Sequence, residues 1–117
     1  MLNAGKAIKV SIYLNEGSRH HSTASEASIL DYLLRSGISG ASVFKGIAGF
    51  GADHHLHSAS LVELSDHLPV KIEFIETQEK IDQVMPKLID LAGTGLIEAQ
   101  ETMVVKPATS LKRSAAG

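Results

Sequence analysis

The fold is decided by the stretch Ile8-Lys9-Val10-Ser11-Ile12-Tyr13-Leu14. Its aliphatic residues occupy every second position, which is the period of a β-strand buried on one face. Polar and turn-forming residues at 15–21 end this strand. The alternation returns in Val70-Lys71-Ile72-Glu73-Phe74, directly after Pro69, and proline is tolerated at the start of a strand. We therefore expect two strands of one sheet.

The segment after the first strand has the spacing of a helix. Its apolar residues recur at helical positions: Ala27, Leu30, Leu33 and Leu34. Thr23 is the expected N-cap, because Glu26 follows it at the capping-box position. Gly37 is the expected left-handed C-cap. This pattern predicts a helix of about four turns that covers one face of the sheet.

A second helix is predicted over residues 78–92. Its apolar stripe consists of Ile81, Val84, Leu88 and Leu91. Thr77 is its expected N-cap, and Gly93 and Gly95 are expected to end it. Pro86 lies inside it and removes one backbone hydrogen bond, which predicts a bend.

Two further strands, at 41–47 and 96–105, complete the order β-α-β-β-α-β. Right-handed crossovers then predict an α+β, ferredoxin-like fold: a four-stranded antiparallel sheet with both helices on one face. The expected domain covers residues 8–106, between an N-terminal extension (1–7) and a flexible C-terminal tail (107–117). Its other sheet face mixes polar residues with Phe44, Ile75 and Val104, a composition that permits a homo-oligomer.

Composition excludes several classes of protein. The 117 residues are 44% hydrophobic and 21% charged, as expected of one globular domain. A net charge of −2 provides no basic surface for nucleic acid. The absence of cysteine excludes disulfides, thiolate metal sites and cysteine nucleophiles. Neither a signal peptide nor an apolar run of about 20 residues is found, so we expect a soluble, cytoplasmic protein.

The loop 46–60 is the densest unusual segment. Gly46, Gly49 and Gly51 free its backbone for positive φ, and amide groups in such a run can bind an anion such as phosphate. The alternative is a glycine-rich loop that orders only against a partner. Lys45 can hold a phosphate or a carboxylate, unless it is simply solvated at the end of its strand. Gly93 and Gly95 can touch a ligand, although helix termination explains both.

The histidines of this loop form the second candidate site. Imidazoles are the commonest ligands of transition metals, and His54, His55 and His57 are proposed ligands of a divalent metal. Asp53 or Glu16 can complete the ligand set. The alternative is that these histidines are solvated side chains. No Ser-His-Asp order or paired-carboxylate motif is present, so we expect a protein that is not an enzyme.

Several stretches together resemble a known family. They are Val43-Phe44-Lys45-Gly46-Ile47-Ala48-Gly49-Phe50-Gly51, His57-Ser58, Leu64-Ser65-Asp66-His67-Leu68-Pro69-Val70, Ile12-Tyr13-Leu14-Asn15-Glu16 and Gly37-Ile38-Ser39-Gly40-Ala41. The chain resembles, over residues 8–106, the PII-like group catalogued as domain of unknown function number one-ninety. The resemblance implies a PII-type ferredoxin-like fold and a homotrimer whose sheets face the threefold axis.

The resemblance also implies a site. Residues 46–60 correspond to the PII T-loop and 93–96 to the B-loop, and in PII proteins an adenine nucleotide between subunits contacts both. The T-loop then docks on a target, such as a membrane transporter or an enzyme. The B-loop here has no basic residue, Lys45 stands where the family has arginine, and His67 stands where it has aspartate. Lys45, Arg19 and Lys106 are the basic residues available as substitutes.

We therefore predict a PII-like signalling protein that binds a small anionic ligand, such as an adenine nucleotide, at subunit clefts. The predicted ligand-binding residues are Arg19, Lys45, Gly46, Gly49, Phe50, Gly51, His57, Gly93 and Gly95. The alternative is a divalent-metal-binding or metal-tolerance protein that uses the loop histidines.

Overall fold

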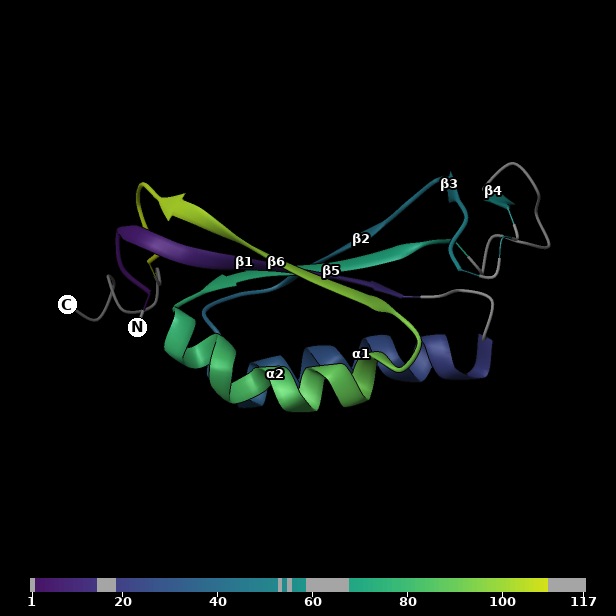
Figure 1. Cartoon of the computed structure of the whole chain (residues 1–117), viewed down its shortest axis with the longest axis horizontal. Coiled ribbons are helices and arrows are strands. Elements are labelled where there is room, and N and C mark those ends of the chain that lie inside the picture. The colour runs from purple at the N-terminus through teal and green to yellow at the C-terminus, as the bar shows by residue number, and fades with distance from the viewer. Residues whose placement is uncertain (1, 15–18, 53, 55, 59–67, 110–117) are drawn as a thin grey trace.

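Four strands form the main sheet of the computed structural model, which describes residues 2–14, 19–52, 54, 56–58 and 68–109, with the backbone alone for 19–25, 57 and 58. These strands are β1 (Gly5–Leu14), β2 (Ser42–Lys45), β5 (Val70–Glu76) and β6 (Leu96–Val104). They are antiparallel in the order β2-β5-β1-β6. Helices α1 (Arg19–Arg35) and α2 (Gln78–Ala92) both lie on one face of this sheet (Figure 1). The predicted α+β ferredoxin-like fold is confirmed.

The core lies between the sheet and the two helices. Alternate residues of β1 and β5 point toward the helices, and the register pairs Ile12 with Ile72 and Val10 with Phe74. These side chains are buried against Ile29 and Leu33 of α1 and Ile81, Val84 and Leu88 of α2. The period of two in the strands and the helical spacing in α2 therefore identify the same buried layer.

Three of the four helix ends have the capping residue that the sequence predicts. Thr77 caps α2, and its hydroxyl accepts a hydrogen bond from the Lys80 amide at 3.3 Å. After α1, Gly37 has φ 77°, and the amides of Gly37 and Ile38 donate to Leu34 and Leu33. This pair of bonds is the Schellman arrangement of a glycine C-cap. Gly93, with φ 57°, ends α2 as expected.

The fourth end, the start of α1, differs from the prediction. The helix begins at Arg19 instead of after Thr23. Residues 19–23 contain no apolar residue at helical spacing, so the sequence pattern gave no reason to include them in the helix. Polar residues can nevertheless be helical, because ordinary residues differ in helix propensity by less than about 0.7 kcal/mol each. A helix that is anchored further along by Ile29 and Leu33 can therefore extend into this polar segment.

Several strand ends also differ from the predicted ones, because pairing with a neighbouring strand sets where a strand begins and ends. β1 begins at Gly5, three residues before the predicted start, because Gly5 pairs with Val104 of β6. β2 covers Ser42–Lys45, shorter than the predicted 41–47. The expected loop 46–60 contains two short strands, β3 (Ala48–Gly49) and β4 (His57–Ser58), which pair with each other. Two residues per strand are too few to produce a readable period. The predicted tail 107–117 lies outside the described residues from 110 onward.

One charged side chain is buried in the layer between sheet and helices. Glu76, the last residue of β5, is only 1% exposed. Its Oε1 accepts hydrogen bonds from the Ser39 amide at 2.9 Å and the Ser39 hydroxyl at 3.0 Å, and its Oε2 accepts from the Thr77 amide at 3.1 Å. These bonds join the segment between α1 and β2 to the start of α2. They also give the buried Glu76 carboxylate the partners that a buried polar group requires.

Candidate functional site

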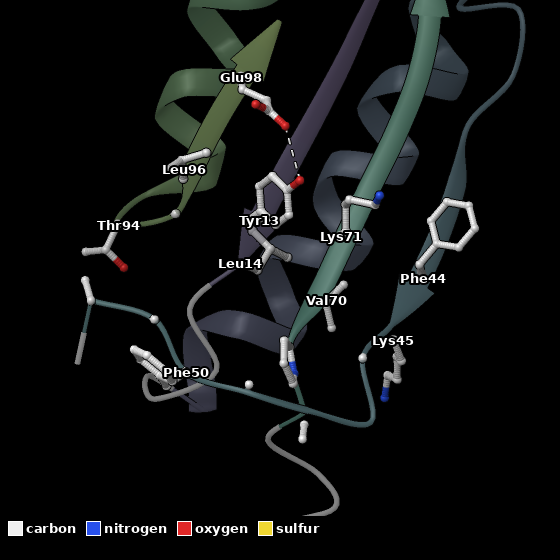
Figure 2. Close-up of a pocket in the computed structure, with 17 residues that line it drawn as sticks. Tyr13, Leu14, Phe44, Lys45, Phe50, Val70, Lys71, Thr94, Leu96 and Glu98 are labelled. Carbon is white, nitrogen blue, oxygen red and sulfur yellow. Dashed lines mark hydrogen bonds between the residues drawn. The ribbon is translucent and has the colours of Figure 1, made fainter. Parts of the chain in front are cut away.

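A cavity of about 1010 Å³ lies at the end of the sheet where β1 ends and β5 and β6 begin. The chain from Lys45 to Ala52 crosses one side of it, and Thr94, Gly95 and Leu96 form the opposite side (Figure 2). Tyr13, Leu14, Val70 and Lys71 come from the two central strands. In Figure 1, β3 and β4 lie beyond this same end of the sheet. The cavity thus combines residues 45–52, the glycine-rich segment, with residues from strands that are distant in the sequence.

The structure corrects the expected role of the loop glycines. Neither Gly46, Gly49 nor Gly51 has positive φ. Gly46 and Gly49 instead lie against Pro69: a Cβ on Gly49 would stand 2.9 Å from the Pro69 Cγ, and one on Gly46 would stand at 3.3 Å. The Gly46 amide also donates to the Pro69 carbonyl at 2.8 Å. The missing side chains therefore allow close packing on Pro69, and the cavity wall is largely backbone.

Position 95 also requires glycine, because other backbone atoms approach it closely. A Cβ at this position would stand 2.5 Å from the Tyr13 carbonyl oxygen and 3.1 Å from that of Ala92. The start of β6 can therefore lie against the end of β1 only without a side chain there. Gly93, by contrast, does not line the cavity, and its positive φ serves the end of α2. Helix termination thus explains Gly93, whereas strand packing explains Gly95.

Charged and aromatic side chains form a row across the sheet face that the helices leave open. The register places Phe44 opposite Lys71, Lys71 opposite Tyr13, and Tyr13 opposite Leu96. The Lys71 Nζ lies 5.2 Å from the centre of the Phe44 ring, a cation–π contact. It also lies 3.2 Å from the Glu73 carboxylate. The ammonium group of Lys71 is thereby held beside the cavity.

Hydroxyl and carboxylate groups lie toward the Leu96 end of this row. The Tyr13 hydroxyl donates to the Glu98 carboxylate at 3.2 Å, as the dashed line in Figure 2 shows. Both residues line the cavity, as does Thr94. Lys45 stands on the far side of the cavity from Thr94 and Leu96 (Figure 2) and is exposed. The cavity therefore has cationic groups at one side and hydroxyl and carboxylate groups at the other.

Phe50 is the aromatic residue of the glycine-rich segment. It lines the cavity and is 68% exposed. The His54 ring is stacked on it, with ring centroids 6.2 Å apart and an angle of 27° between the planes. His54 has φ 59°, the one positive φ found outside glycine among the residues described. Its amide donates to the Gly51 carbonyl at 2.9 Å, which closes a tight turn.

Six of the nine predicted ligand-binding residues come together at this cavity: Lys45, Gly46, Gly49, Phe50, Gly51 and Gly95. Gly93 does not line it, and the side chains of Arg19 and His57 lie outside what the structure describes. Lys106 is not near it either, because it follows the far end of β6, roughly 25 Å along a strand that starts at the cavity. Among the described residues, Lys71 is the second cation that lines the cavity beside Lys45.

The predicted metal ligands stay a prediction. His55 and Asp53 lie outside the described residues, and only the backbone of His57 is described. In the part of the chain that the structure covers, no three His, Asp or Glu side chains are grouped as metal ligands.

Sequence reasoning missed the contributions of the sheet to the cavity. Tyr13, Phe44, Lys71, Leu96 and Glu98 come from four different strands. Their alternation predicted the face on which they lie, but only the register places Tyr13 between Lys71 and Leu96. The predicted strands 8–14 and 70–74 share the same alternating pattern. Pairing them in the sequence analysis would have placed these residues side by side.

Comparisons with known proteins identify relatives over most of the chain. The model of the family DUF190 (Uncharacterized ACR, COG1993) matches residues 7–104. A UPF0166 protein of Methanocaldococcus jannaschii is 38% identical over 105 residues, which cover 89% of this chain and 96% of that protein. Within the described residues, no helix is long and apolar enough to cross a membrane.

Solved structures share the fold. CPII, a nitrogen regulatory PII-like protein from Thiomonas intermedia bound to ADP, AMP and bicarbonate, aligns with a TM-score of 0.63 at 18% identity, covering 92% of this chain and 95% of CPII. A PII-like protein from Thermus thermophilus aligns with a TM-score of 0.64 at 14% identity, covering 89% and 94% of the two chains. At these identities the likeness establishes the fold alone.

Proposed function

This chain belongs to the DUF190 family and has a PII-like fold, and from that premise we propose that it is a non-enzymatic regulatory protein whose cavity binds a small anionic ligand of the adenine-nucleotide class. The observation that carries the proposal is the position of the cavity. It joins the glycine-rich segment, with Lys45 and Lys71, to the residues that follow α2. CPII, which shares this fold, was solved with ADP and AMP bound.

The chemistry of the cavity suits a phosphate-bearing ligand. A lysine ammonium is a common phosphate binder because it acts as a point charge with three donors. Lys45 is exposed at the end of β2, whereas Lys71 is oriented by Phe44 and Glu73. Gly46, Gly49 and Gly51 line the cavity, and the space around Gly51 is open, so a ligand can approach the backbone there. A volume of about 1010 Å³ is at the upper end of ordinary small-molecule sites.

The open face of the sheet supports self-association, and a homotrimer is the form that the resemblance to PII proteins implies. Phe44, Tyr13 and Leu96 are 49%, 41% and 58% exposed in the single chain and stand in one row. Apolar groups exposed together on a sheet face are typical of a surface that a partner covers. In this arrangement the cavity, which the row borders, lies at a boundary between subunits.

The oligomer is tested by the mass in solution. Light scattering should give three chains of 12.4 kDa each. Phe44→Glu places a carboxylate in the exposed row, so this variant should dissociate toward the single chain. Lys87→Glu, a charge change on the exposed side of α2, should keep the mass of the unmodified protein. A single chain of the unmodified protein at tens of micromolar would contradict the trimer.

The ligand is tested by calorimetric titration with ATP, ADP, AMP and cyclic adenine nucleotides. We expect at least one to bind, and Lys45→Gln to weaken it about 10- to 100-fold, because a hydrogen bond to a charged group contributes about 1.5–3 kcal/mol. Lys87→Gln should leave the affinity within about twofold. Absence of heat from every nucleotide up to about millimolar concentration would remove the nucleotide from the proposal.

A further inference from the structure

We propose that Phe50, supported by the stacked His54 ring, is the platform on which an aromatic base of the ligand stacks, so that the cavity selects a nucleotide over a bare phosphate or sugar phosphate. This inference rests on the proposed function and specifies the class of ligand at the same site. It concerns the side of the cavity away from Lys45.

The exposure of Phe50 is the first observation. A phenylalanine side chain in contact with water forgoes the stabilisation that burial would give it. Phe50 is nevertheless 68% exposed. Phe50 is also one of the residues that line the cavity. An aromatic ring that lines a cavity can offer a π-face to a ligand, and every nucleobase can stack on such a face.

The conformation of His54 is the second observation. Residues with a β-carbon seldom adopt positive φ, and they do so where the surrounding structure maintains that conformation. His54 has φ 59°, and its amide is fixed at the end of a turn by a 2.9 Å hydrogen bond to the Gly51 carbonyl. The result is an imidazole stacked at 6.2 Å and 27° on Phe50. A stacked second ring holds the Phe50 ring in place, which reduces the entropy lost when a ligand stacks on it.

The distribution of charge is the third observation. Phe50 and Lys45 stand at opposite sides of the cavity, at the two ends of the glycine-rich segment (Figure 2). Apolar side chains of Leu14, Val70 and Leu96 line the space together with them. A ligand that satisfies both sides carries an anionic group and a flat aromatic group separated by a linker. A nucleoside phosphate has this composition, whereas ribose 5-phosphate carries the anion without the base.

A tryptophan reporter tests the contact directly. The chain contains no tryptophan, so Phe50→Trp introduces a single indole at the proposed platform. We expect AMP to quench its fluorescence by stacking, and ribose 5-phosphate at saturating concentration to leave it unchanged. Ile89→Trp is the matched control, because Ile89 is exposed on α2 and does not line the cavity. Its fluorescence should respond to neither ligand.

Affinity measurements separate stacking from phosphate binding. Stacking of one base on an aromatic side chain corresponds to about a 5- to 150-fold gain in affinity. Phe50→Leu, which keeps an apolar side chain, should weaken AMP binding by at least fivefold and leave ribose 5-phosphate unchanged. Lys45→Gln should weaken both. Because Phe50 is exposed, circular dichroism of Phe50→Leu should match that of the unmodified protein.

The outcomes distinguish this inference from the proposed function. If AMP binds and Phe50→Leu retains its affinity within twofold, the platform is refuted while the nucleotide site stands. If ribose 5-phosphate binds as tightly as AMP, the cavity is an anion site without base selection, and the inference is again refuted. If AMP does not bind but another adenine nucleotide does, the same comparison is made with that nucleotide, and if no adenine nucleotide and no ribose 5-phosphate binds, both the inference and the proposed function fail.

Discussion

The buried carboxylate of Glu76 permits a quantitative test of how this fold is held together. It is 1% exposed and accepts three hydrogen bonds, two from Ser39 and one from Thr77. Glu76→Ala removes these three hydrogen bonds to a charged group, and each such bond contributes about 1.5–3 kcal/mol. Part of this cost is offset, because no charge has to be desolvated in the variant. Three lost bonds less this offset lower the free energy of unfolding by about 3–5 kcal/mol.

Glu76→Gln is the more discriminating variant. The amide oxygen can replace Oε1 and keep both bonds from Ser39 in neutral form, but the amide NH₂ then faces the Thr77 N–H, donor against donor. One charge-assisted bond is lost and two are weakened, while the desolvation of a carboxylate is avoided. The expected loss is about 2 kcal/mol, intermediate between the alanine variant and the unmodified protein.

Urea unfolding followed by circular dichroism measures these losses. The protein concentration is held constant among variants, because the stability of an oligomer depends on it. Glu101→Gln, an exposed carboxylate on β6, is the matched control and should stay within about 0.5 kcal/mol of the unmodified protein. If Glu76→Ala also stays within that range, Glu76 does not hold the segment before β2 to the start of α2, and the reasoning is refuted.

Three further variants test individual positions. Gly95→Ala would place a Cβ 2.5 Å from the Tyr13 carbonyl oxygen, so we expect a loss of about 1–3 kcal/mol in urea unfolding, while Gly40→Ala, which has open space, should show none. Thr77→Ala removes the N-cap of α2 and should lower the stability by about 1 kcal/mol; an unchanged midpoint would show that the cap is dispensable. His54→Gly relieves a positive φ and should raise the thermal unfolding midpoint slightly or leave it unchanged, whereas a clear fall would mean that the imidazole stabilises the fold itself.

The candidate site was only partly accessible to sequence reasoning. Lys45, Phe50 and the loop glycines stood out because they are close together in the chain and unusual in composition. The reason for the glycines was wrong, since Gly46 and Gly49 lie against Pro69 instead of adopting positive φ. Among the described residues of this loop, the one with positive φ is His54, and nothing in a single sequence indicates that a histidine adopts this conformation.

The amino-acid sequence by itself determined the elements whose signal is local. Alternation in 8–14 and 70–74 indicated two half-buried strands, and the stripe of residues between Thr77 and Gly93 indicated α2 with its correct bounds. Neighbours in the chain encode these features, because side-chain direction repeats every two residues in a strand and every 3.6 in a helix.

The tertiary structure alone decided what lies across the sheet. Pairing of Tyr13 with both Lys71 and Leu96 brings together residues that are 58 and 83 positions apart in the chain. The same pairing extended β1 back to Gly5 and required Gly95 to lack a side chain. Periodicity identifies the face of a strand but not its partner or its register. The cavity is therefore a product of register, although the residues that form its glycine-rich wall are visible in the sequence.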